Sequence, residues 1–255
     1  MNHVETIHIV AAANDLYVRH MAIMLNSLLT NKTSGNPVQI HIIDGGTISS
    51  ENKEKLVKSV EKFNQEIRFI PFNNELLEGV KITERFGREA YYRVFIPSLL
   101  PESIHKVIYL DSDLIVLRDI AKLWNINLDT YYLAAVQDSV GINRGRILRI
   151  PADHYFNSGV LVLDLNKWRS DNVTYRVMRY VKRYPRRILI ADQDGLNAVL
   201  HDKWMRLNPE WNCFASLYNA SRPPAIIHYI TINKPWNGNP LGKHEYVKYF
   251  RTTVW

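Results

Sequence analysis

The sequence has few of the features that cross-link or anchor many secreted proteins, namely cysteine pairs, long apolar segments and a signal peptide. Its 255 residues include one cysteine, Cys213, so an internal disulfide is excluded and a reducing compartment is favoured. No segment approaches the ~18 consecutive apolar residues of a membrane span. The longest apolar runs, such as Gly159–Leu163, have the length of a strand, and the first residues lack the pattern of a signal peptide. We therefore expect a cytoplasmic protein that starts at or near Met1.

Acidic residues are outnumbered by basic ones. The chain has 32 Lys and Arg against 25 Asp and Glu, which gives a net charge of +7. Such a charge attracts nucleotides, anionic lipid surfaces or nucleic acid, and does not choose among them. The basic residues are dispersed along the chain and form no recognised nucleic-acid motif, so we expect no nucleic-acid partner.

Strand and helix patterns alternate from the start of the chain, and neither a repeat nor a linker interrupts them. This order predicts an α/β fold with a Rossmann-like, mostly parallel central sheet flanked by helices. Strand patterns lie at Ile7–Ala12, Val38–Ile43, Ile67–Ile70, Lys106–Leu110, Tyr132–Val136, Gly159–Asp164 and Ala225–Tyr229. Helix patterns lie at Asp15–Asn31, Ser49–Phe63, Glu89–Leu99, Asn172–Tyr184 and Asp194–Leu200.

We expect a single domain over residues 1–255. A nucleotide-binding half would span about 1–115, and a second half about 116–240. The polar segment Asn73–Arg88 shows no clear period and is long enough for a loop that covers a site.

The strongest chemical motif is Asp111-Ser112-Asp113, directly after the apolar run Val107–Leu110. Ligands of open α/β sheets bind at the carboxyl ends of the strands, so two carboxylates there can share one hard cation. A turn that ends a strand is the alternative, since Asp and Ser are common in turns.

A second candidate, His228, follows the apolar residues Ile226-Ile227 and precedes Lys234 by six positions. An imidazole can complete a metal site with two carboxylates, and this donor set favours Mn²⁺ over Mg²⁺. Lys234 can neutralise diphosphate oxygens. A packed histidine and a solvated lysine are the alternatives.

Two polar clusters precede regular elements. Asp192-Gln193-Asp194 stands at a helix start, where an Asp can cap the backbone or face a sugar. Asn157 lies in a polar turn before a buried strand and can hold a sugar hydroxyl, although such turns are also ordinary. From the residues alone, both interpretations stay open.

The helix Asn172–Tyr184 has apolar residues on one face and basic residues on the others, and Arg186 and Arg187 follow it. A packed helix with a solvated basic side explains this pattern. Peripheral docking to a membrane-bound or phosphorylated acceptor explains it as well.

Taken together and in order, these motifs resemble glycosyltransferase family 8, the retaining transferases that include bacterial lipopolysaccharide glucosyl- and galactosyltransferases and glycogenin. The resemblance runs from Ile7 to Trp236. Its carriers are Ile9–Asn14, Tyr91-Tyr92-Arg93, Val107–Asp113, Tyr155–Val160, Leu163–Trp168, Asp192-Gln193-Asp194, and His228-Tyr229 ahead of Lys234-Pro235-Trp236.

The resemblance implies a GT-A fold and a retaining hexosyltransferase, with UDP-glucose or UDP-galactose as donor. The acceptor would be a hydroxyl of a glycan, a lipid-linked glycan or a glycoprotein. Asp111, Asp113 and His228 would bind Mn²⁺, with Mg²⁺ as the alternative ion. Asp192 would hold sugar hydroxyls and Gln193 would lie near the anomeric carbon, which makes these two and Asp113 the catalytic candidates.

The same resemblance assigns a nucleotide-sugar site. Its residues would be Ala12, Asn14, Arg93, Asp111, Ser112, Asn157 and Lys234. Two positions depart from the family pattern: Asn14 stands where an Asp is common, and Thr231 replaces a glycine near the diphosphate.

Two other classes of function remain as alternatives. A non-catalytic nucleotide-sugar or glycan-binding module could keep the fold, but the complete Asp111, Asp113 and His228 set argues against it. A nucleotidyltransferase would have a glycine-rich loop after its first strand, and Ala11–Leu16 contains no glycine. Because of the basic helix, we also expect that the protein can act at the inner face of a membrane.

Overall fold

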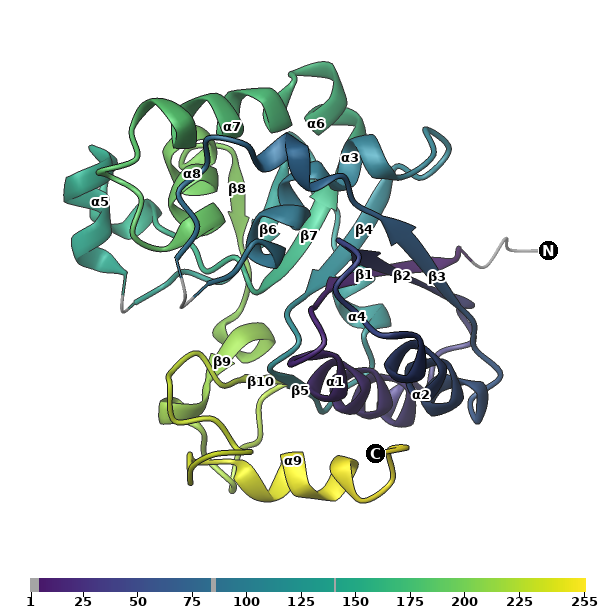
Figure 1. Ribbon diagram of the computed structural model, residues 1–255. Helices are drawn as coiled ribbons and strands as arrows, with labels where there is room; N and C mark the ends of the chain where they lie inside the picture. Colours follow the sequence, from purple (N-terminus) through teal and green to yellow (C-terminus); the bar gives the residue numbers. More distant parts are fainter. Residues whose placement is uncertain (1–4, 84–85, 140) are drawn as a thin grey trace.

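The computed structural model describes residues 5–83, 86–139 and 141–255. Within these residues, a seven-stranded sheet runs through the centre of the molecule in the order β3-β2-β1-β4-β7-β6-β8 (Figure 1). Its strands are β1 (Ile7–Ala12), β2 (Val38–Asp44), β3 (Ile67–Pro71), β4 (Lys106–Leu110), β6 (Leu133–Ala135), β7 (Val160–Asp164) and β8 (Trp204–Arg206).

Parallel pairing joins the strands of the amino-terminal half. β1 pairs in parallel with β2 and with β4, and β2 pairs in parallel with β3. The crossovers are α1 (Val18–Asn31) and α2 (Ser50–Glu61). Among the described strands, β7 runs antiparallel to both of its neighbours, β4 and β6. The prediction of an α/β domain with a Rossmann-like, mostly parallel sheet is confirmed.

Helices cover both faces of this sheet. In Figure 1, α1 and α2 lie on one face and α6, α7 and α8 on the other. Successive side chains of a strand point to opposite faces, so Ile9 and Ala11 pack toward α1 and α2, and Val10 and Ala12 pack into the other layer. No described helix is long and apolar enough to cross a membrane. The further helices are α3 (Ile96–Leu99), α4 (Ala121–Trp124), α5 (Ile142–Leu148), α6 (Leu165–Ser170), α7 (Val173–Arg183), α8 (Ala191–Leu200) and α9 (Lys243–Phe250).

A smaller sheet of three described strands joins the late part of the chain to the main sheet. Its middle strand β10 (Ile226–His228) runs antiparallel to β5 (Leu114–Val116) and parallel to β9 (Cys213–Phe214). The Val116 N–H donates to Ser27 Oγ of α1 at 2.9 Å. Helix α1 therefore holds β5, and through it β10, beside the carboxyl end of β4.

The expected helix Glu89–Leu99 is divided in the structure. A 3-10 helix spans Glu89–Phe95, and the short α3 follows it. Pro97 is the reason, because it has no N–H to donate to Arg93 and its ring would clash with that carbonyl in a continuous α-helix.

The segment expected to form a covering loop, Asn73–Arg88, is partly anchored. Asn74–Leu77 forms a 3-10 helix whose Leu77 is buried in the core. Asn74 Nδ2 also donates to the carbonyl of Gly45 at 2.9 Å. Residues 84–85 of this segment lie outside the described residues.

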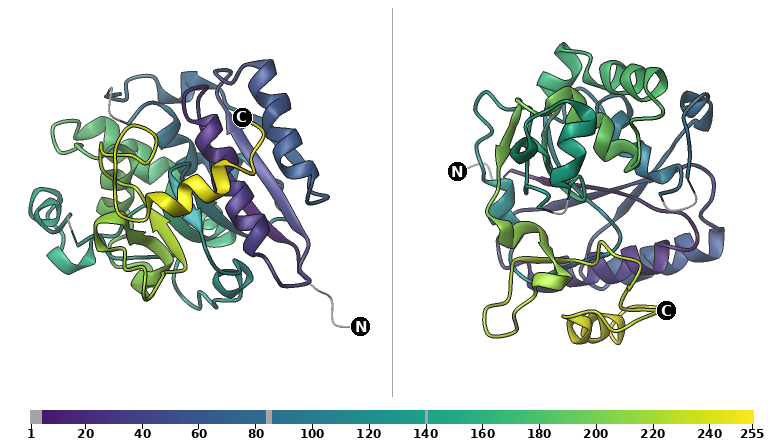
Figure 2. Two further views of the ribbon diagram at one scale, coloured as in Figure 1. Left: turned by 90° about the horizontal axis from the view of Figure 1, so that it is seen from below. Right: turned by 90° about the vertical axis from the view of Figure 1, so that its left-hand side faces the viewer.

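The last helix, α9, had no counterpart among the expected elements. It crosses α1 on the outside of the molecule (Figure 2). The buried Asn26 of α1 donates through Nδ2 to the carbonyl of Tyr249 at 2.8 Å, and Asn31 Nδ2 donates to Tyr249 Oη at 2.7 Å. A polar stripe on α1 thus fixes the carboxyl-terminal helix.

We predict that Asn26→Ala destabilises the protein, because Asn26 Nδ2 donates to the Tyr249 carbonyl and to the hydroxyls of Thr252 and Thr253, and the substitution removes these contacts. A hydrogen bond within a protein contributes about 0.5–1.5 kcal/mol to the free energy of unfolding. Urea denaturation measures this loss. The matched control is Asn143→Ala on the exposed side of α5, which should change the free energy of unfolding by less than about 0.5 kcal/mol. Equal effects of the two substitutions would contradict the anchoring role.

Candidate active site

The Asp111-Ser112-Asp113 turn connects the two sheets, since β4 ends just before it and β5 begins just after it. The Asp111 N–H donates to the carbonyl of Gly159 at 2.9 Å, which fixes the turn to β7. Ser112 Oγ donates to the carbonyl of Ala12 at 3.2 Å, at the end of β1. Three strand ends of the main sheet therefore hold this turn in place.

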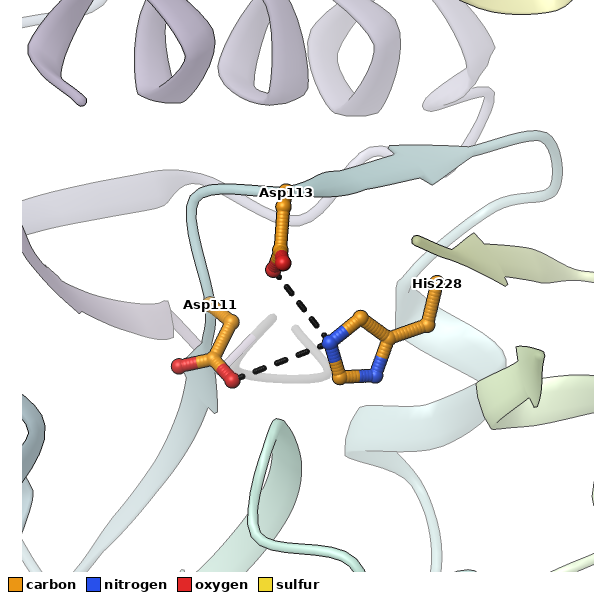
Figure 3. Close-up of side chains that lie close together, drawn as sticks. All are labelled: Asp111, Asp113 and His228. Atoms are coloured by element: carbon orange, nitrogen blue, oxygen red, sulfur yellow. Dashed lines mark ion pairs between the residues drawn. The ribbon is translucent and has the colours of Figure 1, made fainter. Parts of the chain in front are cut away.

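His228 reaches the two aspartates through the small sheet. Its register pairs it with Leu114, the residue after Asp113. His228 Nε2 lies 3.2 Å from Asp113 Oδ1 and 3.8 Å from Asp111 Oδ2 (Figure 3). One ligand atom from each of the three residues fits within a cluster 4.8 Å across. Asp111 and Asp113 stay partly open to solvent, whereas His228 is buried.

Each carboxylate of this cluster uses one oxygen for a cation of the protein and turns the other toward His228. Asp111 Oδ1 pairs with Arg93 Nη2 at 2.9 Å and accepts from Tyr109 Oη at 3.1 Å. Asp113 Oδ2 pairs with Lys234 Nζ. Burial opposes ionisation of Asp113, but the charges of His228 and Lys234 hold the pKa of that carboxyl well below its usual range.

The orientation of His228 suits a metal ligand. Its Nδ1 lies 2.8 Å from Asn212 Oδ1, and an amide oxygen can only accept. Nδ1 therefore carries a proton, and Nε2, which faces the aspartates, is the nitrogen that would bind a metal ion when the imidazole is neutral. Two carboxylate oxygens and an imidazole nitrogen form a donor set that fits Mn²⁺.

Glycine is required at position 159 beside this cluster. A Cβ atom there would lie 2.3 Å from His228 Cε1 and 2.7 Å from Asp111 Oδ2. The absence of a side chain keeps the space between the two ligands open. The sequence motif contains Gly159, but nothing in the sequence indicates that it approaches His228.

Arg93 bridges the metal-ligand candidates and the helix that starts at residue 191. Its guanidinium pairs with Asp111 and, through Nε, with Asp192 Oδ2 at 3.0 Å. It also donates to the Ser158 carbonyl at 2.5 Å and lies over the Tyr109 ring at 4.3 Å. Arg93 is buried, so its position is fixed by these protein partners.

Asp192 lies in a buried position behind Arg93. Burial raises the pKa of this carboxyl to about 7, with a further contribution from the charge of Asp111 and against the lowering effect of Arg93. A buried carboxyl that changes charge near neutral pH is a frequent feature of functional sites.

Gln193 is held by hydrogen bonds at both ends of its amide. Its Oε1 accepts from Asn157 Nδ2 at 3.2 Å and from the Ser158 N–H at 3.1 Å. Its Nε2 donates to Asp138 Oδ2 at 2.9 Å and to Tyr155 Oη at 3.1 Å. The side chain is therefore fixed and buried.

Asn157 and Asn212 connect the sugar-side candidates to the metal-side candidates. Asn212 Nδ2 donates to Asn157 Oδ1 at 2.8 Å, while Asn212 Oδ1 orients His228. A continuous chain of side-chain hydrogen bonds thus runs from His228 through the two asparagines to Gln193. The sequence analysis assigned no role to Asn212 and Asp138, each a single polar residue outside the motifs, and none to Tyr155, which lies in the motif Tyr155–Val160.

Asp194 has a structural position, unlike its neighbour two residues earlier. It is fully buried and forms a two-bond contact with Arg144 of α5, with distances of 2.6 and 3.1 Å. It also accepts from the backbone N–H groups of Leu189 and Ile190 at 2.7 and 2.8 Å. The capping interpretation therefore applies to Asp194, whereas Asp192 faces Arg93.

The residues expected at the nucleotide lie at the end of β1 and beyond β10. Ala12 ends β1, and Asn14 Oδ1 accepts from the N–H groups of Leu16 and Tyr17 at 3.1 and 3.2 Å, in the turn before α1. This local role explains an Asn here, since its amide oxygen stabilises the turn. Thr231 is exposed on the segment that leads to Lys234.

A cavity of about 990 Å³ opens beside this network. Asn212 and Phe214 line its inner side, and Arg118, Glu210 and Arg222 line its outer side. A cavity of this size accommodates a sugar-sized or larger ligand. Asn212, which lines this cavity, is hydrogen-bonded to His228.

We predict that Asn212→Ala weakens Mn²⁺ binding by 10- to 100-fold, as is typical when a ligating histidine loses the partner that orients it. The fold should persist, because Asn212 lies outside the main sheet. Calorimetric titration with Mn²⁺ measures the change, and Asn219→Ala at an exposed turn serves as the matched control. Unchanged Mn²⁺ affinity in Asn212→Ala would show that the hydrogen bond with Asn212 does not orient His228 for metal binding.

Comparisons with known proteins agree with this geometry. The General stress protein A of Bacillus subtilis is 36% identical over 98% of this chain and 95% of its own length. The Lipopolysaccharide 1,2-glucosyltransferase of Escherichia coli is 25% identical over 79% of this chain and 64% of its own length. The crystal structure of the galactosyltransferase LgtC with donor and acceptor sugar analogues superposes with a TM-score of 0.87 at 24% identity, over 98% of this chain and 97% of that one.

The match to LgtC shows that the fold is GT-A, as expected. The model of glycosyl transferase family 8 matches residues 8–239, which is most of the chain. The relatives at the level of sequence include glycosyltransferases. The chain therefore belongs to glycosyl transferase family 8.

Proposed function

We propose that this glycosyltransferase is a retaining hexosyltransferase that moves glucose or galactose from a UDP-sugar to a hydroxyl group of an acceptor. The observation that carries the proposal is the convergence of Asp111, Asp113 and His228 from two different sheets, next to Lys234. A nucleotide diphosphate needs opposing charge at such a point, and a divalent cation together with a lysine can supply it.

The proposed cofactor is Mn²⁺, held by Asp111, Asp113 and His228. When bound, the ion would act as a Lewis acid that stabilises negative charge on the leaving UDP. Lys234 would bind diphosphate oxygens as a point charge, which requires its Nζ to exchange the contact with Asp113 for the substrate. Ser112, Ala12 and Asn14 would line the nucleoside side of the site, where Ser112 already contacts the end of β1.

The proposed sugar site lies between Arg93, Asn157 and the start of α8. Asp192 would accept hydrogen bonds from hydroxyl groups of the hexose, and Arg93 would hold that carboxylate in place. Asn157 belongs to the same hydrogen-bonded chain and would contact the sugar or the phosphate next to it.

For retention we favour attack of the acceptor on the same face that UDP leaves, with the leaving phosphate taking the acceptor's proton. A double displacement would need a carboxylate nucleophile at the anomeric carbon. Gln193 is an amide, and both of its polar atoms are already engaged by protein partners. Its role would be to shape the pocket beside the anomeric carbon.

The proposed acceptor is a glycan, a lipid-linked glycan or a glycoprotein, and it would bind in the cavity beside Asn212. The E. coli relative is a lipopolysaccharide glucosyltransferase by name, which supports a cell-surface glycan as acceptor. Within the domain, residues of about 1–115 would bind the nucleotide. Residues of about 116–240 would hold the sugar and the acceptor and would contribute His228 and Lys234 to the metal and diphosphate site. A lipid-linked acceptor would bring the enzyme to the inner face of a membrane.

A binding module without catalysis is the second candidate for this fold. The three candidate metal ligands are all present, Asn212 orients His228, and Gly159 leaves space between His228 and Asp111. These features favour the enzyme. Loss of catalysis during evolution would leave these positions free to change.

We predict that Asp113→Asn lowers the turnover of UDP-glucose or UDP-galactose at least 100-fold. The substitution removes one charged ligand while its size and the fold are retained. Release of UDP in the presence of Mn²⁺ is the measurement, with UDP-N-acetylglucosamine and GDP-mannose as comparison donors. Asp202→Asn is the control at an exposed residue and should keep full activity.

Three results would contradict this proposal. Turnover of Asp113→Asn within a few-fold of the native protein would reject the metal site. A preference for GDP-mannose would reject the UDP-hexose donor. Activity that is unaffected by removal of divalent ions with a chelator would reject the Mn²⁺ requirement.

A further inference from the structure

The net positive charge of the chain is concentrated in two segments. Residues 142–150 and 172–190 together contain nine Lys and Arg and no Asp or Glu. Because the whole chain has a net charge of +7, the remainder has a net charge of −2. The basic residues appear dispersed in the linear sequence, but the excess that makes the protein basic comes from these segments.

The two segments lie together at the end of the molecule away from the amino terminus (Figures 1 and 2). Arg144 Nη2 of α5 donates to the carbonyl of Arg187, after α7, at 2.5 Å. Leu148 of α5 and Tyr180 of α7 belong to one apolar cluster. We refer to six exposed basic residues of this region as the α5–α7 surface: Arg146, Arg149, Arg179, Lys182, Arg183 and Arg186.

The charges of these six side chains are not neutralised by ion pairs among the described residues. In the described parts of the chain, Arg144 pairs with Asp194, but no ion pair involves a member of the α5–α7 surface. Like charges held close together repel one another, and this repulsion persists at distances below the Debye length of about 8 Å. An extended anionic partner would relieve it.

Two exposed aliphatic side chains lie in the same segments. Ile147 of α5 is 48% exposed, and Leu189, between α7 and α8, is 63% exposed. A soluble polyanion such as a nucleic acid offers little for an aliphatic side chain to contact. A lipid bilayer offers both anionic headgroups for the arginines and an apolar interior for Ile147 and Leu189.

This region is bonded to the first turn of α8, which borders the proposed sugar site. Arg144 and the backbone N–H of Leu189 both bind the carboxylate of Asp194, and Asp194 follows Gln193. A partner that binds the α5–α7 surface would therefore be held at the end of the molecule where α8 begins.

We propose that the α5–α7 surface docks the protein onto an anionic phospholipid bilayer, with Ile147 and Leu189 entering the headgroup region. A protein docked in this way would meet a lipid-linked acceptor at the surface of the bilayer. That consequence rests on the proposed function. Binding to the bilayer itself needs neither donor nor acceptor. It can therefore be tested separately from the transferase reaction.

The test is flotation of the full chain with vesicles of phosphatidylcholine, with or without phosphatidylglycerol. We expect the native protein to float with the anionic vesicles and to remain unbound with the neutral ones. R179Q/K182Q/R183Q should weaken binding at least ten-fold, because each basic residue near an anionic surface contributes to the attraction. The matched control K58Q/K122Q/R251Q removes the same charge from exposed positions on other helices and after α9, and should bind within about two-fold of the native protein.

A second variant, I147S/L189S, keeps every charge and should also weaken binding to the anionic vesicles. Release of UDP from the donor in solution should be unchanged in R179Q/K182Q/R183Q, which separates loss of docking from loss of the enzyme.

Three outcomes would overturn the proposal. In the first, the native protein does not float with anionic vesicles. In the second, the control variant loses binding as strongly as R179Q/K182Q/R183Q, which would indicate that binding depends on the net charge of the protein and not on the α5–α7 surface. In the third, I147S/L189S binds normally while soluble polyphosphate competes fully with the vesicles, which would assign the surface to a soluble polyanion.

Discussion

The pairing of β5 with β10 is the interaction on which the site depends. β5 begins directly after Asp113, and its antiparallel register places His228 opposite the first residue of that strand. A shift of one residue would turn His228 to the opposite face of the small sheet. Helix α1 stabilises this register through the bond between Ser27 and Val116, and α9 in turn packs on α1. These contacts of the late part of the chain therefore place the imidazole of His228 beside the two aspartates.

Two partly buried ion pairs then fix the orientation of the ligands. Arg93 and Lys234 each take one oxygen of an aspartate, so the second oxygen of each carboxylate faces the shared centre. Buried ion pairs contribute little net stability, because desolvation of the charges offsets their attraction. We infer that these pairs are retained for position: a site whose ligands are already oriented loses less entropy when it binds a cation and a diphosphate. The bond between Asn212 and His228 has the same effect on the imidazole.

The sequence predicted the parts of this architecture that depend on local pattern. The apolar runs of β1 and β4 have the bounds expected, and the alternation of strands and helices was sufficient for the fold class. It did not predict β5, β8 or β9, each of which has only two or three residues. Asn212 and Gly159 were not predicted as parts of the site, because their roles come from contacts between residues far apart in the chain.

The central claim is that Asp111, Asp113 and His228 bind one divalent cation at the diphosphate of a nucleotide-sugar. The most direct measurement is a crystal structure of the protein with Mn²⁺ and UDP, in which anomalous scattering locates the metal. The account predicts one strong anomalous peak between the two aspartates and His228 Nε2, in contact with the diphosphate. No peak at this position, or UDP bound away from it, would contradict the account.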